Sequence, residues 1–326
     1  MKPQGYLIEK YDNMGGAYTC RRLRKEAVAR DMELEMLGIH DVYSTTDGLC
    51  HAGQRLAARD FCINRYKYGR LKDEINTLCE RAYNPISSFN AYINKFTQVQ
   101  HIRSDAFIIP NHFVADGAFL SCKMIIANHN AFRSTMDLKH SADLPESEAY
   151  DEARFNSKAK DGFTFVAENL GVPFVMKGLE SSMGAEIYLI HDKHEFSETL
   201  QKYAPEKEWM FEEYISTSYG RDMRLFSVRG KVIAAMERHS EGDFRANVAL
   251  GASVRPLEIT DTFTKAAEDI YQQTKLDFVG IDLLYGEDKS YFCEINVMPG
   301  IEGMEQATGV NVAGVIMETI RGDFLS

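Results

Sequence analysis

The chain has 326 residues, of which 44% are hydrophobic and 26% are charged, and its formal net charge is -11. This length predicts two or three domains with buried cores. A strongly negative chain is a poor partner for the phosphate backbone of nucleic acid. No apolar run approaches the about 18 residues of a membrane span, and the N-terminus lacks a signal-peptide core. We therefore expect a cytoplasmic protein with no nucleic-acid or membrane partner.

The cysteines are scattered, and no two of them form a CxxC pair. This spacing favours reduced thiols over a disulfide framework or a zinc site. The six positions are Cys20, Cys50, Cys62, Cys79, Cys122 and Cys293.

The first 85 residues have the pattern of a small α/β domain. The turn at Asn13, Gly15 and Gly16 is not a GxGxxG fingerprint, so a tight turn fits it better than a dinucleotide site. Asn84-Pro85 then marks a boundary. The expected strands are 6–9, 32–37 and 61–64, and the expected helices are 17–30 and 68–81.

The middle of the chain combines a polar tract with a second set of strands. The stretch from Gly117 to about Lys160 contains an acidic tract with few apolar residues, DLKHSADLPESEAYDEARFNSKAKDG, so we expect a surface excursion that helps to select the acceptor. Further on, Lys177 ends a strand that precedes a loop of small residues, where backbone N–H groups and an ammonium group can contact phosphate. A tight hairpin with an exposed lysine is the alternative. Strands are expected at 173–179, 186–190 and 209–215, and a helix at 194–203.

The last part of the chain contains two predicted hairpins and two helices. The first hairpin turns at Arg229-Gly230. The second turns around Asp288 and places Asp282 opposite Glu294 and Tyr285 opposite Tyr291. Its strands are 278–284 and 290–297, the strands of the first hairpin are 224–228 and 232–237, and the helices are 260–274 and 311–321.

The second hairpin carries a candidate metal site. Side chains alternate between the faces of a strand, so Asp282 faces the same side as Gly280, and Glu294 the same side as Asn296. Unpaired buried carboxylates are costly, and ligands that are all oxygen favour a hard ion such as Mg²⁺ or Mn²⁺. An exposed face that carries acids is the alternative. Three ligands in register before Pro299-Gly300 favour the metal site.

This hairpin and the segments around it resemble the ATP-grasp superfamily, and the RimK-like alpha-L-glutamate ligases in particular. The resemblance rests on Glu294-Ile295-Asn296-Val297-Met298-Pro299-Gly300 after Gly280-Ile281-Asp282, and on the following IEGMEQATGVNVAG. It covers about 230 residues and implies an α/β (α+β) chain with an ATP-grasp fold and an N-terminal Rossmann-like pre-ATP-grasp domain. The implied domains are 1–85, a small lid subdomain at 86–205 with an insertion near 117–160, and a C-terminal subdomain at 206–326 that carries the metal site.

The resemblance also implies roles for individual residues. FEEYI resembles the adenine-binding hinge, Asp222 stands where the family binds ribose, and Arg238, Arg245 and Asn247 match a motif that faces the γ-phosphate and the carboxylate. Lys95 is matched only by its place before a helix; alone it would be an ordinary surface lysine. The implied catalytic residues are Arg238 and Arg245; the ATP-binding residues are Lys95, Lys177, Ser181, Ser182, Gly184, Glu212, Glu213, Tyr214, Ile215, Asp222, Arg245 and Asn247; and the metal ligands are Asp282, Glu294 and Asn296.

The implied function is an ATP- and Mg²⁺-dependent carboxylate-amine ligase that forms an acyl phosphate and is often a homo-oligomer. Glutamate is the expected amine donor, and the acceptor is a carboxylate on a peptide, protein or small molecule. Two alternatives stay open at this point. One is another ATP-grasp ligase, such as a dipeptide ligase or a peptide cross-linking ligase, and the other is a catalytically silent ATP-binding regulatory protein.

Overall fold

The computed structural model describes residues 2–11, 17–121, 124–125, 159–181, 185–247 and 251–325. The chain divides into two compact units: unit 1 comprises Met1–Pro110 and Ile215–Ser326, and unit 2 comprises Asn111–Tyr214. Unit 1 contains two of the larger sheets. The division into three domains stays a prediction. Over the described residues, every helix is too short or too polar to cross a membrane; the cytoplasmic location also stays a prediction.

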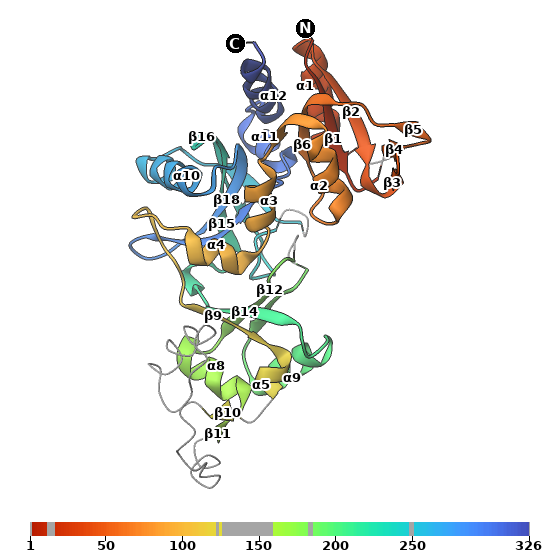
Figure 1. Ribbon diagram of the computed structural model, residues 1–326. Coiled ribbons are helices and arrows are strands. Elements are labelled where there is room, and N and C mark those ends of the chain that lie inside the picture. The colour runs from red at the N-terminus through yellow and green to blue at the C-terminus, as the bar shows by residue number, and fades with distance from the viewer. Residues whose placement is uncertain are drawn as a thin grey trace. The chain divides into compact units, whose positions relative to one another are not determined.

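The N-terminal part of unit 1 is a parallel four-stranded sheet in the order β2-β1-β6-β7 (Figure 1). Helix α1 (Tyr18–Ala29) joins β1 to β2, and α2 (Arg70–Thr77) joins β6 to β7. This is the expected α/β arrangement. The strands are β1 (Gln4–Glu9), β2 (Glu33–Gly38), β6 (Arg59–Asn64) and β7 (Cys79–Tyr83).

Two features of this region differ from the prediction. The helix expected at 68–81 ends at Thr77, and 79–83 form β7 instead. Parallel pairing with β6 and the burial of Tyr83, which is 1% exposed, outweigh the helical spacing of the apolar residues. The second feature, which was not predicted, is a short turn η2 (Ile39–Asp41) followed by the small sheet of β3 (Val42–Thr45), β4 (Gly48–His51) and β5 (Gln54–Arg55).

The second large sheet of unit 1 has six strands in the order β17-β16-β15-β18-β19-β8. All neighbours are antiparallel except β19 and β8. Both predicted hairpins are present. The strands are β8 (Phe107–Ile108), β15 (Arg221–Val228), β16 (Lys231–His239), β17 (Ser253–Pro256), β18 (Phe278–Leu284) and β19 (Ser290–Asn296).

Helices connect the two large sheets of unit 1 through a shared apolar core. This core includes Leu7 and Phe61 from the first sheet, Phe226 from the second, and Ile316. Figure 1 shows α12 beside α1, and Arg30 of α1 forms an ion pair with Glu318 of α12 at 2.9 Å. The helices are α3 (Ile86–Ala91), α4 (Lys95–His101), α10 (Asp261–Thr274), α11 (Glu302–Thr308) and α12 (Val312–Asp323), with the short turn η4 (Ser216–Ser218).

Unit 2 is built on an antiparallel four-stranded sheet in the order β13-β12-β14-β9. Its core is aromatic and includes Phe113, Phe174, Trp209 and Phe211. The strands are β9 (His112–Asp116), β12 (Phe174–Gly178), β13 (Ile187–Ile190) and β14 (Glu208–Glu213), and the other elements are α5 (Gly117–Ser121), β10 (Met124–Ile125), β11 (Ala159–Lys160), α8 (Gly162–Leu170) and α9 (Lys193–Gln201).

The remaining expectations concern cysteines and segments that are only partly described. Within the described residues, five cysteines are free thiols, as expected, and Cys122 lies outside those residues. The first turn at Asn13, Gly15 and Gly16, most of the 117–160 excursion, and Ser182 and Gly184 of the phosphate loop also lie outside the described residues.

Candidate active site

A row of charged side chains crosses three adjacent strands of the six-stranded sheet. Arg224 on β15 lies opposite Asp282 on β18, which lies opposite Glu294 on β19. Directly opposed residues of antiparallel strands place their side chains on the same face. Asp222, two residues before Arg224, lies opposite Arg238 on β16. Sheet register therefore brings together residues that are up to 72 positions apart in the sequence, as the span from Asp222 to Glu294 shows.

Asp282 is at the centre of a buried ion-pair network. It is 2% exposed, and its Oδ1 accepts from Arg224 Nε at 2.6 Å. Its Oδ2 accepts from Arg224 Nη2 at 2.5 Å and from Arg238 Nη2 at 2.9 Å. Arg238 also donates to both carboxylate oxygens of Asp222, at 2.7 and 2.5 Å. Two carboxylates thus share two guanidinium groups, which satisfies the charges that would otherwise be buried alone.

The two carboxylates of this network titrate in opposite directions. Burial raises the pKa of Asp222 to about 6, although Arg238 acts to lower it. Burial also acts to raise the pKa of Asp282, but Arg224 and Arg238 together lower it to about 2. The difference follows from the number of partners, since Asp282 is bonded to two guanidinium groups and Asp222 to one. Asp282 is therefore the member that stays ionised over the whole physiological range.

The hairpin of β18 and β19 confirms one predicted register and corrects the other. Asp282 pairs with Glu294, and Gly280 pairs with Asn296, as expected from a loop centred on Asp288. The expected pairing of Tyr285 with Tyr291 is wrong, because Leu284 pairs with Tyr291. A register shift after Asp282 leaves one extra residue in β19, as in a β-bulge. The candidate metal ligands lie before this shift, where the pairs from Gly280–Asn296 to Asp282–Glu294 are in regular register.

The oxygen atoms of this hairpin fit a hard cation. Glu294 forms an ion pair with Lys95 Nζ at 3.5 Å, and Asn296 Oδ1 accepts from the backbone N–H of Met298 at 3.0 Å. Each oxygen can accept more than one bond. Mg²⁺ binds carboxylate and amide oxygens and keeps several waters, so Asp282, Glu294 and Asn296 would suffice. No group of three or more His, Cys, Asp or Glu side chains arranged as a metal site occurs within the described residues; the predicted set contains only two of these residue types and one asparagine.

Arg245 and Asn247 lie in the loop that follows β16. Arg245 Nη2 contacts Asp243 Oδ2 at 2.6 Å, and the hydrogen bonds from Arg245 lower the pKa of the Asp243 carboxyl. Asn247 accepts a backbone bond from Ala252 at 3.3 Å. Asp243 orients the Arg245 guanidinium within its own loop, and the roles of Arg245 and Asn247 toward a substrate stay predictions.

Unit 2 contains a second buried ion pair. Lys177 of β12 and Glu212 of β14 are 5% and 3% exposed, and Lys177 Nζ lies 2.5 Å from Glu212 Oε2. Among the described residues, Glu212 Oε1 has no hydrogen-bond partner although it is buried. The alternative interpretation, a tight hairpin with Lys177 exposed, is therefore wrong on this point, because Lys177 is buried. The pair leaves one strong acceptor unused.

The segment predicted as the adenine hinge follows directly from Glu212. The Glu213 carboxylate accepts from the backbone N–H and the side-chain amide of Asn111, at 3.0 and 2.8 Å. Ser181 donates to the Gly178 carbonyl at 3.0 Å, at the end of β12. Tyr214 and Ile215 are half-buried. These contacts fix the backbone at the two ends of the strands, while contacts of these residues with ATP stay predictions.

Arg224 is the functional candidate that the sequence pattern did not identify. It makes two hydrogen bonds to Asp282, yet it is 58 positions away in sequence. Its position two residues after Asp222 gave a usable signal, because alternate residues of a strand share a face.

Comparison with known proteins identifies the family of the chain. A model of the RimK-like ATP-grasp domain matches residues 133–320, more than half of the chain. A probable alpha-L-glutamate ligase 2 of Shewanella amazonensis is 39% identical over 152 residues, which are 46% of this chain and 50% of that protein. A probable alpha-L-glutamate ligase of Psychromonas ingrahamii is 27% identical over 307 residues, 92% of this chain and 90% of that protein. In the first of these matches, the chain spans about half the length of its relative.

Solved structures give the same fold. A RimK domain protein ATP-grasp from Sphaerobacter thermophilus has a TM-score of 0.62 at 14% identity and covers 97% of this chain and 98% of that chain. The ATP-grasp ligase PsnB complexed with minimal precursor also has a TM-score of 0.62, at 15% identity and 98% coverage of both chains. The expected mixed α/β ATP-grasp fold is therefore confirmed, and the chain belongs to the RimK-like ATP-grasp family.

Proposed function

We propose that the protein is an ATP-dependent carboxylate-amine ligase that joins glutamate, or a similar amino acid, to a carboxylate on a peptide, protein or small molecule. The observation that carries this proposal is the Asp282–Glu294 pairing on the hairpin of a RimK-like chain, with Arg224 and Arg238 bonded to Asp282. Relatives named alpha-L-glutamate ligase support glutamate as the donor.

The reaction has two balanced steps. An oxygen of the acceptor carboxylate attacks the γ-phosphorus of ATP, the bond to the β-γ bridging oxygen breaks, and ADP leaves. The amine nitrogen then attacks the carbonyl carbon of the resulting acyl phosphate, the single bond from that carbon to the phosphate oxygen breaks, and inorganic phosphate leaves while the amine loses a proton. Both steps gather negative charge on oxygen, so fixed positive groups lower the barrier.

Each candidate residue has a defined task in this chemistry. In unit 1, Arg238 and Arg245 would stabilise charge on the transferring phosphoryl group, and Asp222 would accept from the ribose hydroxyls. Asp282, Glu294 and Asn296 would hold Mg²⁺ (or Mn²⁺), which when bound neutralises phosphate charge. Arg224 would orient the Asp282 carboxylate. Lys95, the first residue of α4, would neutralise phosphate oxygens beside Glu294.

In unit 2, the buried Lys177 would contact the phosphates with Ser181, Ser182 and Gly184. Glu212, Glu213 and Tyr214 would contact the adenine base together with Ile215 of unit 1, and Asn247 of unit 1 would contact a phosphate. A lysine held at 2.5 Å from a buried carboxylate has few accessible rotamers, so it would meet the nucleotide without losing further side-chain entropy.

The test is ADP and phosphate release by the purified chain with ATP and Mg²⁺, against amino acids, short peptides and a lysate filtrate. Release that needs both a carboxylate and an amine, with a product heavier by the amine minus water, supports ligation. Tight ATP binding without release in the presence of any of these mixtures would favour the regulatory alternative.

A peptide cross-linking ligase is the second candidate, because structural neighbours include the ATP-grasp ligase PsnB complexed with precursor peptide PsnA2 and the macrocyclase MdnC bound with precursor peptide MdnA. The two candidates differ in product mass. An intermolecular ligation adds the amine minus water, whereas an internal cross-link removes one water from the peptide and adds nothing.

A further inference from the structure

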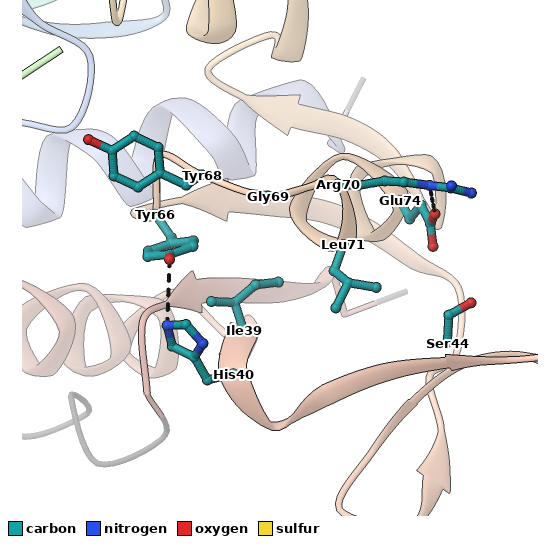
Figure 2. A pocket seen from close by; sticks show the side chains of 9 residues that line it. All are labelled: Ile39, His40, Ser44, Tyr66, Tyr68, Gly69, Arg70, Leu71 and Glu74. Atoms are coloured by element: carbon teal, nitrogen blue, oxygen red, sulfur yellow. Dashed lines mark hydrogen bonds and ion pairs between the residues drawn. The ribbon is translucent and has the colours of Figure 1, made fainter. Parts of the chain in front are cut away.

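The N-terminal α/β part of unit 1 contains a pocket of about 500 Å³ that none of the catalytic assignments uses. Figure 2 shows the rings of His40, Tyr66 and Tyr68 at one end, and Ser44 with Arg70 and Glu74 at the other. Ile39 and Leu71 lie between the two ends in this view (Figure 2). Gly69 completes the lining. The volume is within the range of small-molecule sites.

The pocket lies at the carboxyl ends of parallel strands. Ile39 and His40 follow β2, and Tyr66 and Tyr68 follow β6, while β1 is hydrogen-bonded between these two strands. The strand that follows β1, β2, pairs with one edge of β1, and the later strand β6 pairs with its other edge. In open parallel sheets, ligands bind outside the carboxyl ends where the strand order reverses in this way. The position of the pocket is thus one that α/β domains use for ligands.

The wall formed by the rings has the chemistry of an aromatic-binding surface. His40 and Tyr66 are 5.6 Å apart at 70°, and Tyr66 and Tyr68 are 6.0 Å apart at 84°, so both contacts are edge-to-face. Tyr66 Oη also lies 3.5 Å from His40 Nε2. Tyr68 is 49% exposed and contributes little to the core. Such an array leaves ring edges and faces that a further ring can contact.

The charge of the lining favours a neutral ligand. The charged side chains Arg70 and Glu74 pair with each other at 2.5 Å. Ile39 is 5% exposed and gives the pocket an apolar floor. With Arg70 paired to Glu74 and His40 neutral, the lining residues carry no net charge, and the chain as a whole is strongly negative, with a formal charge of -11. A flat, uncharged ring suits this surface better than an acid or a phosphate.

The pocket is connected to the hairpin that carries the candidate metal ligands. Arg65, which precedes Tyr66, donates through Nη1 to the Pro299 carbonyl at 3.2 Å. Pro299 is only three residues after Asn296. We propose that the pocket binds a neutral aromatic side chain of the acceptor, whose carboxylate is activated at the hairpin. The connection to the acceptor rests on the proposed ligase function, whereas the affinity for a neutral ring does not.

The first experiment measures binding without ATP, by calorimetry on the full chain with N-acetyl-L-tyrosinamide. We expect saturable binding in the millimolar range that is about two- to tenfold weaker in Tyr68→Ala and in Tyr66→Ala, because one aromatic contact is lost in each. Tyr66→Phe keeps the ring and should bind as the wild type does. Tyr43→Ala is the matched control, because Tyr43 is 46% exposed on β3 but does not line the pocket.

Three results would overturn the site: no saturable binding of N-acetyl-L-tyrosinamide, equal binding of N-acetyl-L-alaninamide or N-acetyl-L-glutamate, or equal losses in Tyr68→Ala and Tyr43→Ala. The connection to the acceptor is tested separately by phosphate release. Tyr68→Ala should raise KM for acceptors with an aromatic side chain and leave KM for ATP unchanged. If binding is found but no acceptor mixture stimulates phosphate release, the proposed function fails and the aromatic site stands.

Discussion

The two buried ion-pair sites differ in how completely the protein satisfies them. In unit 1, each oxygen of Asp222 and Asp282 accepts at least one bond from Arg224 or Arg238. In unit 2, Lys177 contacts one oxygen of Glu212, and within the described residues the other oxygen is buried without a hydrogen bond. A satisfied network holds its members in one arrangement, whereas a buried acceptor without a donor is costly until a ligand provides one. We infer that the network of Asp222 and Asp282 is preorganised and that the pair of Lys177 and Glu212 is stabilised by a ligand.

The largest expected effect separates Glu294 from the ion-pair network of Asp222 and Asp282. Glu294→Gln removes a partly exposed carboxylate that lies 3.5 Å from Lys95 Nζ, so we expect phosphate release to fall about a hundredfold or more with little change in stability. Glu287→Gln, at an exposed position in the loop of the same hairpin, is the matched control and should retain activity. A Glu294→Gln enzyme with Mg²⁺-dependent activity near that of the wild type would exclude Glu294 as a metal ligand.

The next prediction addresses unit 2. Lys177→Met leaves Glu212 buried without its cation, which should reduce the free energy of unfolding by about 3 kcal/mol and weaken ATP binding more than tenfold. The double variant Lys177→Met/Glu212→Leu removes both charges, so its stability should return toward the wild-type value while its ATP affinity does not. Urea unfolding and calorimetry with ATP measure the two quantities. Recovery of ATP affinity in the double variant would show that Lys177 serves only to neutralise Glu212.

Asp282→Asn tests the network of unit 1. The substitution keeps the volume but removes the charge that two guanidinium groups share, so it should cost about 3 kcal/mol of stability as well as activity. Unlike Glu294→Gln, it should shift the urea midpoint. Equal stability of the Asp282→Asn and Glu294→Gln variants would contradict the distinction between Asp282, which is buried in the ion-pair network, and the more accessible Glu294.

The smallest expected effect is a pH dependence from Asp222. Its pKa is raised to about 6 by burial, above the ordinary unfolded value of about 3.9. The folded state therefore holds a proton that the unfolded state releases, and the stability that this carboxyl contributes is lost as pH rises from about 4 to about 6. The unfolding free energy of the wild type should therefore fall relative to that of Asp222→Asn as pH rises through this range. A difference that grows in favour of the wild type with rising pH would mean that pairing with Arg238 outweighs burial.

Local patterns in the sequence predicted the strands of this site better than they predicted which residues of neighbouring strands pair with each other. The period of two along β18 and β19 placed Asp282 opposite Glu294 correctly, whereas no side-chain pattern signals the register shift that pairs Leu284 with Tyr291. The family resemblance supplied Arg238. Arg224 was missed because its partner Asp282 lies on a strand whose pairing with β15 depends on the whole sheet.

The N-terminal region shows the same limit. The apolar spacing at Leu71, Ile75 and Leu78 is helical, but β7 begins at Cys79 because β6 provides a parallel partner. The aromatic pocket was not predicted either, since His40 and Tyr66 are 26 positions apart and meet only when β2 and β6 flank β1. Long-range register decides these features, and a single sequence does not encode it in any local period.

The most direct test of the central claim is ADP release in the presence of ATP, Mg²⁺ and a panel of carboxylates with glutamate or other amino acids, followed by mass analysis of the product. We expect release that requires an acceptor and an amine, is lost in Glu294→Gln and yields an amide. Release at an equal rate without any acceptor or amine, or with no amide product, would contradict it.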